Sequence, residues 1–421
     1  MKICVLGLGY IGLPTAAIFA YSGCEVVGVD LKPEIVDNLN RKMTSIDEPG
    51  LNEIIMTSVD SGRLRASTAP EPADAYIIAV PTPNKNDSFM SCDLTYVLNA
   101  CDSILPFLRD GNVVIVESTI APCSMDEWIQ PFFEKRGFTI GKDIYLAHCP
   151  ERVLPGRILH ELVYNNRIIG GVTRNCTEAA ANIYSVITKG ELIKTDARTA
   201  EMAKCMENTF RDVNIALANE FFKICYHLQV DVLEAIRIAN QHPRVNIHQP
   251  GPGVGGHCLA VDPFFIYAKS PEYAKIIKLA RETNNDMPRF VVELTKKLTA
   301  AHENSKIAVF GITYKGNVSD TRESPALKII EMLKKEGFRL AVNDPHVTDD
   351  GLVDVTQAVT EADLILVLAD HEEYRHLNHA KLAKLMRTPL LFDTKNFVQQ
   401  QPNSGLKIIN FGNVFQFAEQ A

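Results

Sequence analysis

Apolar and polar positions in the first part of the chain predict a parallel β-sheet. Short, almost wholly apolar runs, typical of strands buried on both faces, are separated by longer segments of helical character. The runs cover residues 3–6, 25–29, 76–80, 113–116, 144–147 and 167–171. Strands that alternate with helices predict a doubly wound α/β fold.

The pattern becomes helical near residue 195. Between residues 199 and about 228 the sequence contains neither proline nor glycine. Apolar residues recur there at helical spacing, at Met202, Met206, Phe210, Val213 and Leu217. Further helices are expected at 231–240, from 271 to about 284, and from 288 to 302. The middle of the chain is therefore predicted to be all-helical, with one long helix.

Strands resume at residue 306 with an internal repeat. Residues 306–311 (KIAVFG) repeat the pattern of residues 2–7 (KICVLG), and Asp344 follows Gly337 by seven residues, as Asp30 follows Gly23. A helix is expected at 325–336 and strands at 364–368 and 390–392. The repeat predicts a second doubly wound domain that lacks the glycine-rich turn of the first.

These patterns predict an α/β protein of two Rossmann-like doubly wound domains joined by a central all-helical segment with a long helix. The expected boundaries are 1–195, 196–302 and 303–421. A length of 421 residues supports this division, since such a chain is too long for one ordinary core.

Composition narrows the class of protein. The formal net charge of −8 argues against a nucleic-acid-binding surface, and no apolar run reaches the 18 residues of a membrane span. A strand directly after Met1 leaves no room for a signal peptide. The ten cysteines are scattered singly without a CxxC pair, so neither a disulfide framework nor a structural zinc site is expected. We therefore expect a cytoplasmic globular protein.

A dinucleotide-binding fingerprint follows the first strand, with glycines at Gly7, Gly9 and Gly12. In this motif the first glycine makes the tight turn, the second admits the pyrophosphate and the third lets helix pack on strand. The phosphates then lie at a helix N-terminus, which favours negative charge. Asp30, at the end of the second strand, can accept hydrogen bonds from both ribose hydroxyls and would repel a 2′-phosphate. NAD is therefore expected rather than NADP.

Thr82, Thr119 and Glu151 come just after predicted strands. Residues past the carboxyl ends of parallel strands face the ligand, so these three are candidates for cofactor or substrate contact. Each residue type is also common in ordinary turns.

Residues 250–263 (PGPGVGGHCLAVDP) form the stretch where we expect the chemistry. Cys258 follows four glycines and precedes Asp262 by four residues, which makes it a candidate nucleophile. The alternative is a glycine-rich turn with a buried structural cysteine.

Lys204 and Asn208 are one turn apart on the predicted long helix and are candidates for the same site; the alternative is that they belong to a solvated face. A zinc site of His242, His248, His257 and Cys258 has irregular spacing and is disfavoured.

A thiol gains a role when an aldehyde is oxidised to an acid. Its thiolate adds to the aldehyde, the thiohemiacetal loses a hydride to a second NAD, and water hydrolyses the thioester. Lys204 and Asn208 would stabilise the oxyanion, and Asp262 and Glu151 would move protons. In the last third of the chain, basic loop residues suit a phosphate-bearing substrate: Lys315, Arg322 and Lys395.

Motifs along the whole chain resemble those of the UDP-glucose/GDP-mannose dehydrogenase family, which oxidises the C6 alcohol of a nucleotide sugar to a carboxylate with two NAD. They are GLGYIG, PTP, EST, CPERVLPG, TAEMAKCMENTFRDVNIALANE, HPRVN, GPGVGGHCLAVDP and TRESP. The resemblance implies the fold predicted above, with dimers or higher oligomers built on the central helix.

The resemblance also implies residue roles. For catalysis it implies Cys258 as nucleophile, support from Lys204, Asn208 and Asp262, Glu151 as base for thioester hydrolysis, and a hydroxyl from Thr119. For the cofactor it implies Gly7, Gly9, Tyr10, Ile11, Gly12, Asp30, Thr82, Thr119 and Arg322. For the UDP-sugar it implies Arg152, Val153, Lys204, Asn208, Arg244, Gly255, Lys315 and Lys395, with Arg244 often acting on the neighbouring subunit. No metal is implied.

Within the family, CPERVLPG, HPRVNI and PGPGVGGHCLAVDPFF are most similar to the branch that oxidises UDP-N-acetyl-D-mannosamine for surface polysaccharides. The UDP-glucose branch has Phe-Leu-Arg-Glu-Gly after its Pro-Glu and a lysine before the active-site aspartate. This chain has residues 152–156 (RVLPG) and Val261 there, and Lys395 stands in place of a late arginine. UDP-N-acetylglucosamine and UDP-glucose remain alternative substrates.

Two other functions fit part of the sequence. A two-electron hydroxyacid dehydrogenase would share the first domain and the helix lysine but would leave Cys258 without a role. A non-enzymatic nucleotide-sugar-binding protein would need none of the cysteine, lysine and glutamate set.

Overall fold

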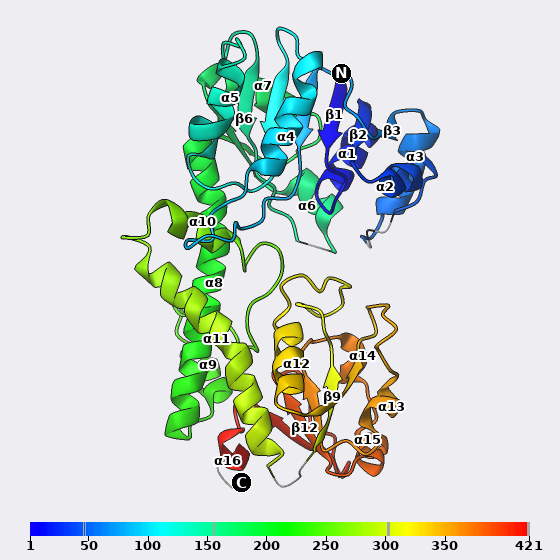
Figure 1. Ribbon diagram of the computed structural model, residues 1–421, viewed down its shortest axis with the longest axis vertical. Coiled ribbons are helices and arrows are strands. Elements are labelled where there is room, and N and C mark those ends of the chain that lie inside the picture. Colours follow the sequence, from blue (N-terminus) through cyan, green and yellow to red (C-terminus); the bar gives the residue numbers. More distant parts are fainter. Residues whose placement is uncertain (45, 47, 155, 301–303, 419–421) are drawn as a thin grey trace. The chain divides into compact units, whose positions relative to one another are not determined.

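The computed structural model describes residues 1–44, 46, 48–154, 156–300 and 304–418 (Figure 1). The chain divides into two compact units. Unit 1 comprises Met1–Glu207 and Phe264–Tyr273, and unit 2 comprises Asn208–Pro263 and Ala274–Ala421. Both are α/β, which confirms the predicted fold class, whereas the boundaries at residues 195 and 302 stay a prediction. Within the described residues, no helix combines the length and apolar composition needed to cross a membrane.

An eight-stranded sheet organises unit 1 (Figure 1). In the order 3-2-1-4-5-6-7-8, neighbouring strands are parallel except for β6 and β7, which are antiparallel. The strands are β1 (Lys2–Leu6), β2 (Glu25–Val29), β3 (Leu64–Ser67), β4 (Ala75–Ile78), β5 (Val113–Val116), β6 (Tyr145–His148), β7 (Arg167–Gly171) and β8 (Leu192–Asp196). The six predicted strands are confirmed to within two residues at each end. The two that the sequence did not reveal, β3 and β8, are edge strands that mix polar and apolar residues.

Helices and short turns connect these strands. The α-helices are α1 (Gly12–Tyr21), α2 (Pro33–Asn40), α3 (Leu51–Asp60), α4 (Thr95–Ile104), α5 (Gln130–Glu134), α6 (Ile158–Tyr164) and α7 (Arg174–Tyr184). A 3₁₀ turn covers Leu105–Phe107 and a π-helical turn covers Met125–Ile129. Helix α1 is buried from Gly12 to Ala20, against β1, β2 and α3, and apart from Thr15 its buried residues are apolar.

The long predicted helix is α8 (Ala197–Leu228), whose residues up to Glu207 belong to unit 1 and the rest to unit 2. Unit 2 continues with α9 (Val232–Ala239) and α11 (Lys275–Leu298), and α10 (Asp262–Lys269) starts in it. Phe222 of α8 stacks on Phe411, with ring centroids 3.9 Å apart. This part of α8 therefore belongs to the hydrophobic core of unit 2.

Helix α11 runs through Pro288, so the expected division into two helices at this proline was wrong. A proline inside a helix lacks an N–H and crowds the carbonyl four residues earlier, at a cost of about 3 kcal/mol. Met287, Val291 and Leu294 are all buried in the core of unit 2. Burial of this continuous apolar face outweighs the local penalty. The expected end at residue 302 lies outside the described residues.

A five-stranded parallel sheet, in the order 10-9-11-12-13, completes unit 2. Its strands are β9 (Lys306–Phe310), β10 (Arg339–Asn343), β11 (Leu364–Val367), β12 (Leu390–Asp393) and β13 (Lys407–Asn410). Its helices are α12 (Pro325–Lys335), α13 (Val355–Val359), α14 (Glu372–Arg375), α15 (His379–Leu385) and α16 (Phe415–Ala418). Alternate residues of β9 and β11 enter two separate hydrophobic clusters, so both faces of the sheet are buried.

Within unit 1, Glu201 ties the start of α8 to the chain after β5. Its buried carboxylate accepts hydrogen bonds from the backbone N–H groups of Cys123 at 2.6 Å and Met125 at 2.7 Å. Cys123 has φ +68°, a conformation that few non-glycine residues adopt. Burial nevertheless raises the pKa of Glu201 to about 7, because desolvation outweighs the two hydrogen bonds.

This raised pKa gives a stability prediction. A carboxyl group whose folded pKa lies above its unfolded value near 4.5 stabilises the fold at acidic pH and loses that contribution as the pH rises through 7. The stability of the wild type relative to Glu201→Gln should therefore fall by up to about 3 kcal/mol between pH 5 and pH 8. Thermal unfolding across this range checks the effect, and Glu53→Gln on the exposed side of α3 is the control. A constant difference between wild type and Glu201→Gln would contradict the prediction.

Candidate functional site

The turn between β1 and α1 has the geometry of a dinucleotide-binding loop. Gly7 has φ +93°, which favours glycine, and its N–H donates to the Val29 carbonyl at 2.7 Å. A Cβ at Gly12 would lie 1.8 Å from the Gly7 carbonyl oxygen, whereas a Cβ at Gly9 would meet nothing within 4 Å. Gly12 is therefore required by the chain itself, and Gly9 leaves open space for a ligand. Tyr10 and Ile11 complete the loop and are half-buried.

Asp30 holds this loop from the end of β2. Its carboxylate accepts hydrogen bonds from the backbone N–H of Leu8 at 3.0 Å and of Lys32 at 2.9 Å. The open space at Gly9, the N-terminus of α1 and this partly exposed carboxylate fit the pyrophosphate and ribose of NAD. When bound, NAD supplies a hydride acceptor.

Thr82 and Thr119 come together past the ends of β4 and β5. The Thr82 hydroxyl donates to the Thr119 carbonyl at 2.7 Å, so the two loops are joined at this point. Glu151 lies past the end of β6 and is buried, with the Arg152 N–H donating to it at 2.6 Å. The side chain of Arg152 forms an ion pair with Glu207 at 2.6 Å, and Val153 packs against the core. All these residues belong to unit 1.

Lys204 is also in unit 1, and it is buried on α8. The sequence did not reveal that His148, the buried last residue of β6, interacts with Lys204. Its Nδ1 lies 2.9 Å from the Val116 carbonyl and must donate to it, which makes Nε2 the unprotonated nitrogen. Burial, together with the charge of Lys204, lowers the pKa of His148 to about 3. His148 is therefore neutral near pH 7, and it lies close enough to Lys204 for the two side chains to interact electrostatically.

In unit 2, Cys258 lies in a turn that leads into α10, and its side chain is exposed. The Asp262 N–H donates to the Cys258 carbonyl at 2.9 Å, so the thiol is one turn before the first residue of that helix. Asp262 is buried, and the Asn208 amide donates to its carboxylate at 2.5 Å. The structure thus brings together Asn208 and Asp262, which the sequence placed 54 positions apart.

A buried polar network holds both ends of residues 251–259, the loop that carries Cys258 and is called the cysteine loop below. Arg281 of α11 donates to the Leu259 carbonyl at 3.3 Å and to Asp212 of α8 at 2.7 Å. At the other end, the Gly251 N–H donates to Asn219 of α8 at 2.8 Å. Burial is the main influence on Asp212 and raises its pKa, although Arg281 opposes it. The loop is therefore positioned by α8 and α11.

The glycines of the loop allow close packing against residues 314–325. A Cβ at Gly255 would lie 2.5 Å from the Glu323 carbonyl oxygen, and one at Gly256, which has φ +84°, would lie 2.9 Å from the Tyr314 ring. Arg322 donates to Asp320 at 2.6 Å, and its charge acts on both Cys258 and His257. Burial, followed by the charge of Arg322, lowers the pKa of His257, which favours a neutral imidazole there.

The remaining candidates are spread over unit 2. Lys315 and Arg244 are exposed, and Lys395 forms an ion pair with Asp370 at 3.3 Å. Lys315 follows β9 and Lys395 follows β12, so both lie at the carboxyl edge of the parallel sheet. Ligands of such sheets bind at this edge.

Asp344 repeats the position of Asp30 but has one additional partner. Its carboxylate accepts from the Ile312 N–H at 2.7 Å and the His346 N–H at 2.9 Å, just as Asp30 accepts from Leu8 and Lys32. Buried His371 adds a third contact at 3.1 Å. Burial would raise the pKa of Asp344, but these hydrogen bonds outweigh it and hold the pKa below its ordinary value. The histidine covers the carboxylate that would hold a ribose, so this turn no longer suits a dinucleotide.

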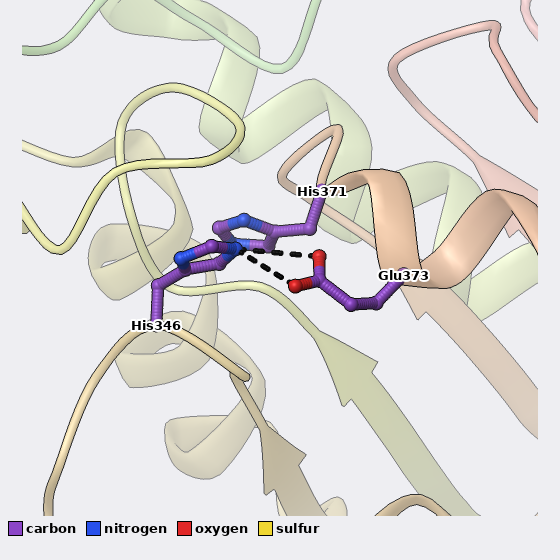
Figure 2. Close-up of side chains that lie close together, drawn as sticks. All are labelled: His346, His371 and Glu373. Atoms are coloured by element: carbon purple, nitrogen blue, oxygen red, sulfur yellow. Dashed lines mark hydrogen bonds and ion pairs between the residues drawn. The ribbon is translucent and has the colours of Figure 1, made fainter. Parts of the chain in front are cut away.

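His346, His371 and Glu373 form the single group of potential metal ligands found among the described residues (Figure 2). His346 lies 3.2 Å from Glu373. The Nδ1 of His371 accepts from the Asn317 N–H at 3.0 Å, so its Nε2 carries the proton that bonds Asp344. The two imidazoles are stacked 4.7 Å apart, so their in-plane lone pairs do not converge. We interpret these residues as structural: their hydrogen bonds join the loop after β10 to the loop after β11.

A dinucleotide fingerprint on one mostly parallel sheet, a second doubly wound sheet and an exposed thiol in a glycine-rich loop define a nucleotide-dependent oxidoreductase. The sequence matches three domains of the UDP-glucose/GDP-mannose dehydrogenase family: the NAD binding domain over residues 1–188, the central domain over 198–286 and the UDP binding domain over 308–400. The chain belongs to this family. It is an oxidoreductase of the NAD-dependent UDP-sugar dehydrogenase class.

Individual relatives are similar over almost the whole chain. A UDP-N-acetyl-D-mannosamine dehydrogenase of Methanococcus maripaludis is 47% identical, with 98% of this chain and 97% of the relative covered. An NDP-N-acetyl-D-galactosaminuronic acid dehydrogenase of Ralstonia solanacearum is 45% identical, with 90% and 93% covered. The native structure of the UDP-N-acetyl-mannosamine dehydrogenase of Staphylococcus aureus has a TM-score of 0.93 at 54% identity, with 99% and 100% covered.

The two glycines of the NAD loop should respond differently to substitution. Gly9→Ala adds a Cβ in open space, so it should leave thermal stability unchanged but raise the Kd for NAD at least about tenfold, which corresponds to about 1.4 kcal/mol. Gly12→Ala forces its Cβ onto the Gly7 carbonyl and should lower the Tm of the apoprotein. Calorimetry with and without NAD separates the two effects. A destabilised Gly9→Ala, or a Gly12→Ala of unchanged Tm, would contradict this account of the loop.

Proposed function

We propose that the protein oxidises the C6 alcohol of UDP-N-acetyl-D-mannosamine to the carboxylate, with two NAD consumed per acid, for surface polysaccharide biosynthesis. The observation that carries the four-electron reaction is the exposure of Cys258. The other nine cysteines are buried or half-buried, whereas this one is presented at the start of a helix by a loop anchored at both ends. The positive end of a helix favours a thiolate. A structural cysteine would need neither exposure nor this support.

The proposed reaction gives each candidate residue a role. After the alcohol has been oxidised to the aldehyde, the Cys258 thiolate adds to the aldehyde carbon and forms a thiohemiacetal. Loss of a second hydride gives a thioester, and water then releases the acid. Lys204 and Asn208 stabilise the oxyanions, and Asp262, held by Asn208, moves the proton of the substrate oxygen. Glu151 activates the water, and Thr119 contributes a hydroxyl.

The binding residues are proposed on the same basis. Gly7, Gly9, Tyr10, Ile11, Gly12, Asp30, Thr82, Thr119 and Arg322 would contact NAD. Arg152, Val153, Arg244, Gly255, Lys315 and Lys395 would contact the UDP-sugar, together with Lys204 and Asn208. For Arg322, the structure adds an ion pair with Asp320 and an electrostatic interaction with Cys258.

The reaction predicts two NADH for each acid formed. Cys258→Ser should retain UDP-sugar binding but form no acid, because its hydroxyl is a far weaker nucleophile. NADH absorbance, together with mass spectrometry of the product, measures both quantities. Cys225→Ser, which changes a half-buried cysteine of α8, is the matched control and should behave as wild type. One NADH per turnover, or full acid formation by Cys258→Ser, would overturn the mechanism.

The same assay decides the substrate. UDP-N-acetyl-D-mannosamine is favoured by the names of the relatives from Methanococcus and Staphylococcus, and UDP-N-acetylglucosamine and UDP-glucose are the alternatives. The Ralstonia relative makes an N-acetylgalactosamine nucleotide a further competitor. We expect the highest kcat/KM for UDP-N-acetyl-D-mannosamine. A higher value for any of the other three would replace it as the substrate.

We also propose a homodimer formed through α8. Met206 and Phe210 are 58% and 67% exposed, and Leu217, Ile224 and Leu228 continue the same exposed helical stripe. Such a stripe on a soluble protein is typical of an interface.

Phe210→Lys should convert the dimer to a monomer, because it places an unpaired charge in the apolar interface. Light scattering after size-exclusion chromatography measures the mass. Leu327→Lys, at an exposed apolar position on α12, is the control and should remain a dimer. A monomeric wild type, or a dimeric Phe210→Lys, would contradict the proposed interface.

A further inference from the structure

A buried chain of charges in unit 1 joins the proposed base to residues that have no role so far. Arg167, the first residue of β7, forms ion pairs with two carboxylates. Its guanidinium lies 3.0 Å from Glu151, and it is also paired with Glu117, the residue after β5. All three side chains are at least nine-tenths buried. The sheet therefore places one cation between two anions, past the ends of β5 and β6.

Both carboxylate oxygens of Glu117 have hydrogen-bond partners. The Tyr184 hydroxyl donates to one of its oxygens at 3.1 Å, and Thr15 of α1 donates to the other at 3.2 Å. The Arg167 guanidinium also lies 3.9 Å over the Tyr184 ring. Glu117 thus fixes the guanidinium, and the guanidinium in turn contacts Glu151. Since Thr15 lies on the helix that follows the NAD loop, the chain of contacts starts at the cofactor helix.

The charges explain why two carboxylates share one arginine. Burial raises the pKa of Glu117 to about 7, with Arg167 opposing this and Glu151 adding to it. Burial disfavours the Arg167 cation, but the surrounding acidic groups, Glu151 first and then Tyr184 and Glu117, outweigh it and hold the pKa of Arg167 above its ordinary value. The other titratable neighbours are neutral near pH 7, because burial raises the pKa of Tyr184 well above its usual value and that of Cys149 to about 12.

Stability alone gives little reason for this arrangement. Buried ion pairs are often no more stabilising than apolar residues of similar volume, because both charges lose their hydration. A general base, however, becomes neutral when it takes a proton. If Arg167 had Glu151 as its single partner, that proton would leave a buried cation unbalanced. When Glu151 takes up a proton, its charge no longer raises the pKa of Glu117, so Glu117 ionises more readily and balances the Arg167 cation.

We propose that Arg167 and Glu117 are positioning residues for the hydrolysis step: Arg167 aligns Glu151, and Glu117 is the counter-ion that balances Arg167 when Glu151 accepts a proton. The inference rests on the role proposed above for Glu151. In that step the water oxygen bonds to the thioester carbon while one water proton passes to Glu151. The C–S bond then breaks, and its electron pair returns to the sulfur of Cys258. Both hydride transfers precede this step and do not use Glu151.

The test separates hydrolysis from the oxidations. In Glu117→Gln the amide keeps hydrogen-bonding capacity but loses the charge, so proton uptake by Glu151 becomes less favourable. We expect a burst of two NADH per site at a rate within about twofold of wild type, and then a steady-state rate at least about tenfold slower. The covalent thioester should accumulate on Cys258, as seen by intact-protein mass spectrometry. The rising limb of the pH–rate profile should move to lower pH.

Substitutions of Arg167 complete the experiment. Arg167→Lys, which keeps a cation, should hydrolyse the thioester faster than Arg167→Met. If Arg167→Met does not fold, Glu117→Gln and Arg167→Lys decide the matter. Glu71→Gln, which breaks the more exposed pair of Arg65 and Glu71, is the matched control and should show neither the burst nor the pH shift.

Thioester accumulation on Cys258 in the different variants distinguishes a wrong positioning role from a wrong reaction mechanism. If Glu151→Gln accumulates the thioester while Glu117→Gln and Arg167→Lys hydrolyse it at the wild-type rate, the positioning role is overturned. An equal fall in burst and steady-state rates would show a merely structural role and would also overturn it. If no variant, Glu151→Gln included, carries a covalent adduct on Cys258, the thioester mechanism itself fails.

Discussion

The carboxyl ends of adjacent parallel strands meet at one edge of a sheet, and the chemistry of this protein depends on that constraint. In unit 1 the NAD loop, Thr82, Glu117 and Glu151 follow β1, β4, β5 and β6, which are neighbours in the sheet. Residues far apart in the sequence are therefore brought into contact without any local signal, as Thr15 and Glu117 are across 102 positions. The antiparallel β7 then enters from the opposite direction, so its first residue, Arg167, arrives at the same edge.

The same supersecondary unit is used twice with different results. In both sheets an aspartate at the end of the second strand holds the turn after the first strand through a backbone N–H. Asp30 remains partly exposed, and Gly9 leaves open space beside it. Asp344 is buried under His371, whose tautomer is set by the Asn317 N–H. The buried histidine, together with the loss of the glycine-rich turn, thus distinguishes a dinucleotide loop from a turn that retains the fold but no longer suits that ligand.

Buried arginines position the proposed chemistry in each unit. Arg167 connects Glu117 to Glu151 in unit 1, and Arg281 connects Asp212 to the Leu259 carbonyl beside Cys258 in unit 2. Neither arginine is itself a proposed reacting group. A planar guanidinium with five donors can bridge two partners at fixed geometry, which lysine cannot do. Desolvated ion pairs add little stability, so their value here is orientation.

Much of this protein was readable from sequence, where the signal is local. Buried strands are uniformly apolar, glycines mark backbone positions that exclude a Cβ, and the family motifs lie in short contiguous segments, so the fold class, the NAD loop and the cysteine loop were predicted. The edge strands β3 and β8 were missed because they are partly polar, and α11 was wrongly divided because packing of a buried face outweighs one proline. The pairing of Asn208 with Asp262, the covering of Asp344 by His371, and the Glu117–Arg167–Glu151 chain were decided by tertiary structure alone. Each joins residues from different elements, and the partner of a buried charge is set by the fold that surrounds it.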